Sequence, residues 1–103
     1  MNNLGLVLQE LGDLEGAKAL YERALAIGDR VLDPDHLNIA VYAGNLGRNL
    51  QELGDLEGAK AQVERALWTF RQFLGEEHPY TVRAIRDLEG IVYLLAKRAS
   101  IGE

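Results

Sequence analysis

The chain has 103 residues, of which 48% are hydrophobic and 26% are charged, and its formal net charge is −5. This composition is typical of one globular domain, and the excess of acidic residues argues against binding to nucleic acid. The absence of cysteine excludes disulfides and thiolate metal sites. Because no apolar run reaches the about 18 residues of a membrane-spanning helix, and no signal peptide is evident at the start, we expect a cytoplasmic protein that does not associate with membranes.

One segment of the sequence occurs twice, with an offset of 42 residues. Residues Leu8 to Leu25 read LQELGDLEGAKALYERAL, and residues Leu50 to Leu67 read LQELGDLEGAKAQVERAL, so that sixteen of the eighteen aligned positions are identical. A period of this length indicates stacked supersecondary units, each of which is too small to bury its own apolar face. Two copies this similar indicate either a recent internal duplication or a designed sequence.

Apolar residues at spacings of three and four predict α-helices throughout and no strands. In chain order, the five predicted helices lie near 2–11, 14–32, 36–53, 56–74 and 78–99. Connections of two to five residues join them, so neighbouring helices should run antiparallel.

Turn residues mark the expected helix ends. Gly12 and Gly54 suit the left-handed conformation that ends a helix, and the next residues, Asp13 and Asp55, suit N-caps. The last predicted helix follows a turn in which Pro79 stands at a first helical position.

Gly5 and Gly47 occupy equivalent positions inside two predicted helices. Glycine at such a position costs roughly 1 kcal/mol relative to alanine, so a matched pair needs a compensating reason. We predict that the missing side chain lets the following helix approach closely.

Residues at fixed places in both copies carry a family resemblance. Leu4-Gly5-x-x-Leu8 followed by Ala17-x-x-x-Tyr21 and Ala24 resembles the tetratricopeptide repeat, and Leu46-Gly47-x-x-Leu50 opens the second copy. A standard repeat of that family has about 34 residues, whereas the period of 42 is similar to a variant found in kinesin light chains and in the arrays of many bacterial signalling proteins.

The resemblance implies an all-α fold, an antiparallel helix-hairpin solenoid of about 2.5 units and five helices. A single domain would cover residues 1–103. Repeat 1 would take about 1–34, repeat 2 about 36–76, and a capping or half-repeat helix about 78–99.

In this family the helix face opposite the buried stripe lines a concave groove that holds a peptide. On the third predicted helix that face carries Val41, Asn45, Arg48, Gln51 and Glu52. The equivalent faces of the first and last helices add Asn3, Leu6, Gln9, Arg83, Arg86 and Tyr93.

Two residue types in this groove have a specific chemistry. Asn3 and Asn45 can donate to and accept from a peptide main chain. Arg48, Arg83 and Arg86 would favour an acidic segment or a C-terminal carboxylate if they converge. Alternatively, neighbouring acidic side chains, Glu52 and Asp87, neutralise these arginines instead.

No pattern in the sequence predicts a metal, a cofactor or catalysis. His36 and His78 stand at equivalent places before successive helices, which favours a repeated capping role over metal binding. Ser100 has no acid or histidine at a useful spacing. We therefore predict a protein that is not an enzyme.

The predicted function is a scaffold that binds a short peptide or a protein surface in the concave groove. The alternative is a self-association module, which would form dimers or filaments through Ile91, Leu94 and the tail through Ile101. A further alternative is that the chain is a fragment of a larger bacterial signalling protein. Trp68 either anchors a partner or packs partly under the next helix.

Overall fold

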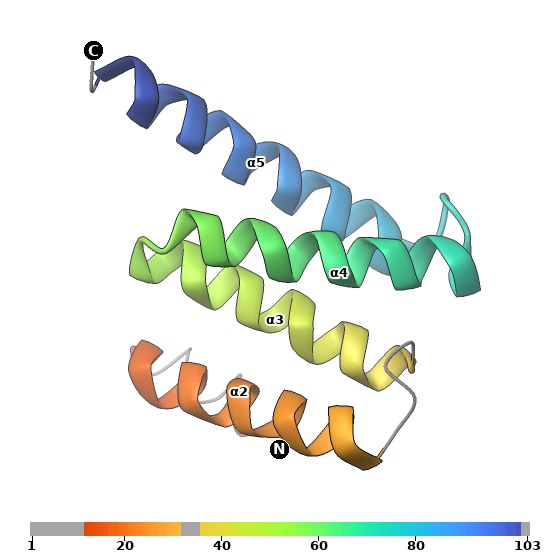
Figure 1. Ribbon diagram of the computed structural model, residues 1–103. Coiled ribbons are helices and arrows are strands. Elements are labelled where there is room, and N and C mark those ends of the chain that lie inside the picture. Colours follow the sequence, from red (N-terminus) through yellow and green to blue (C-terminus); the bar gives the residue numbers. More distant parts are fainter. Residues whose placement is uncertain (1–11, 32–35, 102–103) are drawn as a thin grey trace.

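A computed structural model describes residues 12–31 and 36–101. Within these residues the chain forms helices only, namely α2 (Leu14–Val31), α3 (Leu37–Leu53), α4 (Leu56–Leu74) and α5 (Pro79–Ile101). Successive helices run antiparallel and lie side by side in chain order (Figure 1). The predicted all-α architecture is thus confirmed. The count of five helices and 2.5 units is not matched, because four helices are described and the one expected near 2–11 lies outside the described residues.

Histidine side chains cap the N-terminal ends of two helices, α3 and α5. His36 is the N-cap of α3, and its Nδ1 accepts a hydrogen bond from the backbone N–H of Asn38 at 3.1 Å. His78 does the same before α5, where its Nδ1 accepts from the N–H of Tyr80 at 3.1 Å. Each bond satisfies a backbone donor that the helix itself leaves unpaired. The two histidines therefore have the repeated capping role that their spacing indicates.

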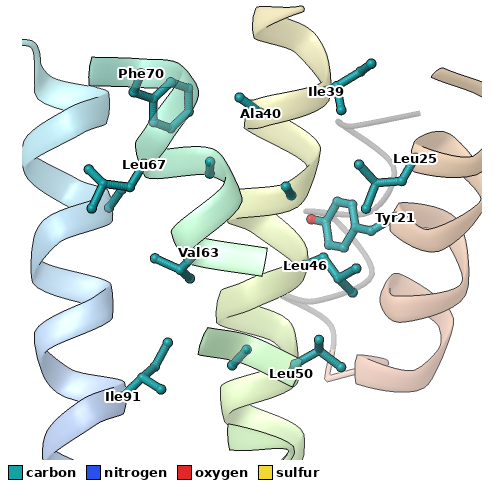
Figure 2. Packing of buried hydrophobic residues seen from close by; sticks show 14 of the residues in the cluster. Tyr21, Leu25, Ile39, Ala40, Leu46, Leu50, Val63, Leu67, Phe70 and Ile91 are labelled. Carbon is teal, nitrogen blue, oxygen red and sulfur yellow. The ribbon is translucent and has the colours of Figure 1, made fainter. Parts of the chain in front are cut away.

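The apolar stripes of the four helices form one continuous core (Figure 2). Tyr21 and Leu25 of α2 pack with Ile39 and Leu46 of α3, and the apolar side of α4 lies between α3 and α5. Ile91 of α5 is fully buried in this core. The expectation that Ile91 packs against another copy of the chain is therefore wrong.

Small residues bring α3 and α4 together. A Cβ atom on Gly47 would overlap Cγ2 of Val63 and would lie 3.2 Å from the carbonyl oxygen of Ala59. One turn earlier, a Cβ on Gly44 would lie 3.7 Å from that of Ala66. The close approach predicted for Gly47 is thus present, while Gly5 lies outside the described residues.

The last helix breaks this pattern of small residues. Glu89 occupies the position 42 residues after Gly47, and it is exposed. Val92 occupies the position 42 residues after the buried Leu50, and 46% of its surface is exposed. Among the described residues no further helix covers this side of α5.

The packing at Gly47 is testable with a substitution that elsewhere stabilises helices. We expect Gly47→Ala to lower the free energy of unfolding by about 1–3 kcal/mol, because the added methyl group overpacks a buried contact. The matched control is Gly90→Ala in α5, where an added Cβ meets nothing within 4 Å. That variant should be more stable than the wild type by about 0.5–1 kcal/mol. Urea denaturation followed by circular dichroism measures both, and equal effects would contradict the close approach.

Candidate peptide-binding groove

A cavity of about 180 Å³ opens between the middle of α3, the end of α4 and the first turns of α5. Its lining combines apolar, aromatic, amide and cationic groups. The lining residues are Val41, Gly44, Asn45, Arg48, Phe70, Tyr80, Arg83 and Ala84. The lining residues that α3 contributes are three or four positions apart and so lie on one face of that helix, and the same holds for those of α5.

Aromatic rings form one wall of this cavity. The ring of Tyr80, at the start of α5, lies 5.6 Å from the ring of Phe70 in α4 at a tilt of 51°. The imidazole of His78 meets Tyr80 edge-on at 4.9 Å. Both distances lie within the range of favourable aromatic pairs. The rings of Phe70 and His78 therefore help to hold Tyr80 in the lining of the cavity.

Arg48, which lines the cavity, links α3 to α5. Its Nη1 forms an ion pair with Oδ2 of Asp87 at 3.2 Å, and its Nη2 donates a hydrogen bond to Oδ1 of Asn45. The two charged side chains are 23% and 20% exposed. For Arg48, the alternative in which Asp87 neutralises the arginine is therefore the arrangement present in the structure.

Arg83 is the second cation of the cavity, and it differs from Arg48 in its surroundings. Its side chain is exposed and forms no ion pair with any described residue. The positive charge of Arg83 is thus accessible to a ligand, whereas that of Arg48 is already compensated.

The structure gathers only part of the predicted groove. Val41, Asn45, Arg48 and Arg83 line the cavity together. Gln51, Glu52, Arg86 and Tyr93 lie outside its lining, and Asn3, Leu6 and Gln9 lie outside the described residues. The three arginines therefore do not converge as a set.

The internal repeat explains why Arg86 is elsewhere. It stands 42 residues after Gly44, and the nearest neighbour of a Cβ at Gly44 is Ala66 of α4. By the same register, Arg86 lies on the side of α5 where a following helix would pack, and it is exposed.

Phe70 and Tyr80 also line the cavity, although the sequence did not predict them as groove residues. Tyr80 shares a helix face with Arg83 and Ala84, and this spacing could have identified it. Phe70 belongs to the apolar stripe of α4, so only the tertiary structure shows that it reaches the cavity.

Tyr21 lies buried near the charge of Arg48. Only 1% of the tyrosine is exposed, and its hydroxyl has no hydrogen-bond partner among the described residues. Burial raises the pKa of Tyr21, and the positive charge of Arg48 opposes part of that shift.

Neither a metal-binding cluster nor a membrane-spanning helix is found among the described residues. They contain no group of three or more histidine, cysteine, aspartate or glutamate side chains that could hold a metal ion. Within the same residues, none of the helices combines the length and the apolar character that crossing a membrane requires.

A second cavity of about 250 Å³ lies between α4 and α5, on the side of Trp68. Glu64, Leu67, Arg71, Gln72 and Leu88 complete its lining. The indole of Trp68 is 53% exposed. This exposure agrees with the interpretation in which Trp68 packs partly under the next helix, since about half of the residue remains open to solvent.

Comparison with known proteins gives a consistent result. A family model described as the tetratricopeptide repeat matches residues 1–67, which is more than half of the chain. No curated protein sequence matches the chain significantly.

Among solved structures, the chain is similar to a protein from Podosopora anserina described as a candidate kinesin light chain with nearly identical TPR-like repeats. The TM-score is 0.82, the sequence identity is 22%, and the match covers 93% of this chain and 46% of the other. The chain thus spans less than half the length of that relative, and at this identity the likeness is one of fold.

The buried hydroxyl of Tyr21 predicts a specific dependence of stability on pH. Above the ordinary tyrosine pKa of about 10, the unfolded chain loses this proton before the folded chain does, so stability falls as pH rises through the folded value. We expect Tyr21→Phe to lie within about 1 kcal/mol of the wild type at neutral pH and to lose less stability than the wild type at alkaline pH. Urea denaturation at several pH values measures the difference, and parallel curves would contradict the raised pKa.

Proposed function

Because the chain belongs to the tetratricopeptide repeat family, whose members are generally modules for protein–protein interaction, we propose that it binds a peptide or protein surface in the groove between α3 and α5. The proposal rests chiefly on the cavity in which Val41, Asn45, Arg48 and Arg83 meet. Its apolar and aromatic lining residues suit a side chain of the partner, while the amide and guanidinium groups suit main-chain and acidic groups.

The charges of the groove favour an acidic segment or a C-terminal carboxylate as the ligand. Arg83 supplies an accessible guanidinium, which can bind a carboxylate through two parallel hydrogen bonds. Tyr80, beside it, adds a hydroxyl and an exposed ring. Since the cavity is small, we expect a single side chain of the partner to enter it and the affinity of a short peptide to be weak.

No catalytic family is indicated by the comparisons. The proposed activity is therefore binding without turnover, and the expected partners are proteins rather than nucleic acids or membranes.

A second candidate function is self-association through exposed side chains of α4 and α5. It is favoured by the exposed apolar side chains of Trp68, Phe73, Val92 and Tyr93. Leu94 is only half-buried and remains available for such a contact. Scattered apolar residues are also normal on a monomer, so the groove remains the first proposal.

The acidic preference is tested with a matched pair of arginine variants. The probes are two capped six-residue peptides, one with two glutamates and one with two lysines at the same positions. We expect Arg83→Gln to weaken binding of the glutamate peptide about tenfold, because one charge-assisted contact is lost.

Arg86→Gln removes the same charge from the same helix outside the cavity, and it should change the affinity by less than about twofold. Isothermal titration calorimetry or chemical-shift titration measures both variants. Equal affinity of the wild type for the glutamate and lysine peptides would refute the acidic preference.

Self-association is tested by molecular mass over a range of protein concentrations. We expect the wild type to stay monomeric in sedimentation equilibrium, with Trp68→Ala as a variant that leaves this result unchanged. A dimer that weakens with Trp68→Ala would instead support the second candidate function.

A further inference from the structure

We propose that Asp87 is a built-in competitor for the acidic group of a bound peptide, because it occupies the guanidinium of Arg48 when the groove is empty. The inference rests on the proposed function and assigns to Asp87 the control of how many acidic groups the groove recognises. Arg83 attracts the first carboxylate of the partner, and Asp87 withholds Arg48 from a second.

The geometry places the competition at a single guanidinium. Nη1 of Arg48 lies 3.2 Å from Oδ2 of Asp87, and Nη2 donates to Oδ1 of Asn45. Arg48 also lines the cavity, whereas Asp87 does not. A carboxylate that enters the cavity therefore meets a cation whose charge a neighbouring residue of α5 already compensates.

Partial exposure lets a ligand carboxylate reach the guanidinium of Arg48 and compete with Asp87 for it. The two side chains are 23% and 20% exposed, so the pair is neither fully dry nor fully screened by water. When a ligand carboxylate takes the place of Asp87, one anion replaces another at the same cation. The gain at Arg48 is therefore small while Asp87 is present, and Arg83 provides most of the attraction.

The internal repeat supplies an independent observation. Asp87 stands 42 residues after Asn45, so the last unit carries an acid where the preceding unit carries an amide. The amide at this place serves as an acceptor for Arg48 without adding charge. The change from asparagine to aspartate in the last unit thus introduces an anion beside Arg48, and Asp87→Asn restores the residue that the preceding unit carries.

The experiment compares three variants against the two-glutamate peptide and its two-glutamine counterpart at about 0.15 M salt. Asp87→Asn should bind the glutamate peptide about three- to tenfold more tightly than the wild type, with a steeper salt dependence. Its affinity for the glutamine peptide should not change. Asp87→Glu keeps the competing carboxylate and should bind like the wild type.

Asp29→Asn is the matched control for the loss of an acid. Asp29 forms an ion pair with Arg65 at 2.5 Å, between α2 and α4 and away from the cavity. The control removes the same charge and also breaks an ion pair between helices. It should leave both affinities within about twofold of the wild type.

The outcomes separate this inference from the function on which it rests. If the wild type binds the glutamate peptide and Asp87→Asn binds it equally or more weakly, Asp87 positions Arg48 and the inference is overturned, while the proposed function stands. If no variant binds either peptide, both are overturned.

A measurement on the wild type covers the case in which Asp87→Asn does not fold. Saturation with the glutamate peptide should shift the NMR signals of the Arg83 guanidinium and leave those of the Asp87 carboxyl near their free positions, because Asp87 keeps its ion pair with Arg48. A shift of the Asp87 carboxyl as large as that of Arg83 would overturn the inference.

Discussion

The close approach of α3 and α4 at Gly47 is the contact on which the rest of the arrangement depends. A side chain at that position would collide with Val63 and crowd the backbone of Ala59, so only glycine allows the two helices to pack at this distance. Because α4 packs against both α3 and α5, while α3 and α5 touch only slightly, the position of α4 determines how far apart the walls of the groove lie. The size of the cavity between α3 and α5 therefore depends on how closely α4 packs against α3.

The groove also depends on local interactions that place α5. His78 caps this helix and meets the ring of Tyr80, which in turn packs near Phe70 of α4. Further along α5, the ion pair between Arg48 and Asp87 ties this helix to α3 beside the cavity. These contacts hold apolar, aromatic and charged groups within one small space, and this combination is typical of sites that bind side chains of a partner.

The same position in successive units has different consequences because its neighbours differ. Gly47 is pressed against a following helix, whereas Glu89, its equivalent in α5, faces solvent in the described part of the chain. Leu50 is buried and Val92 is exposed for the same reason. Asn45 and Asp87 are equivalent in the repeat, yet one accepts a hydrogen bond from Arg48 and the other forms an ion pair with it. A repeated sequence therefore does not imply a repeated role in α5, against which no further helix packs in the described part of the chain.

Local patterns in the sequence were enough to predict the described helices and their order. Apolar spacing, capping residues and the 42-residue period predicted α2 to α5 to within one or two residues at each end, because these signals act within a few turns of one helix. The sequence also identified Gly47 as a point of close approach, placed Val41, Asn45 and Arg48 on one face of the third predicted helix, and placed Arg83 on the equivalent face of the last one. The tertiary structure sets which of these side chains share a cavity. It placed Arg86 outside the groove, brought in Phe70 and Tyr80, buried Ile91, and joined Arg48 to Asp87. Those outcomes depend on the distance and rotation between helices that are far apart in the chain, and the periodicity of a single helix contains no information about either.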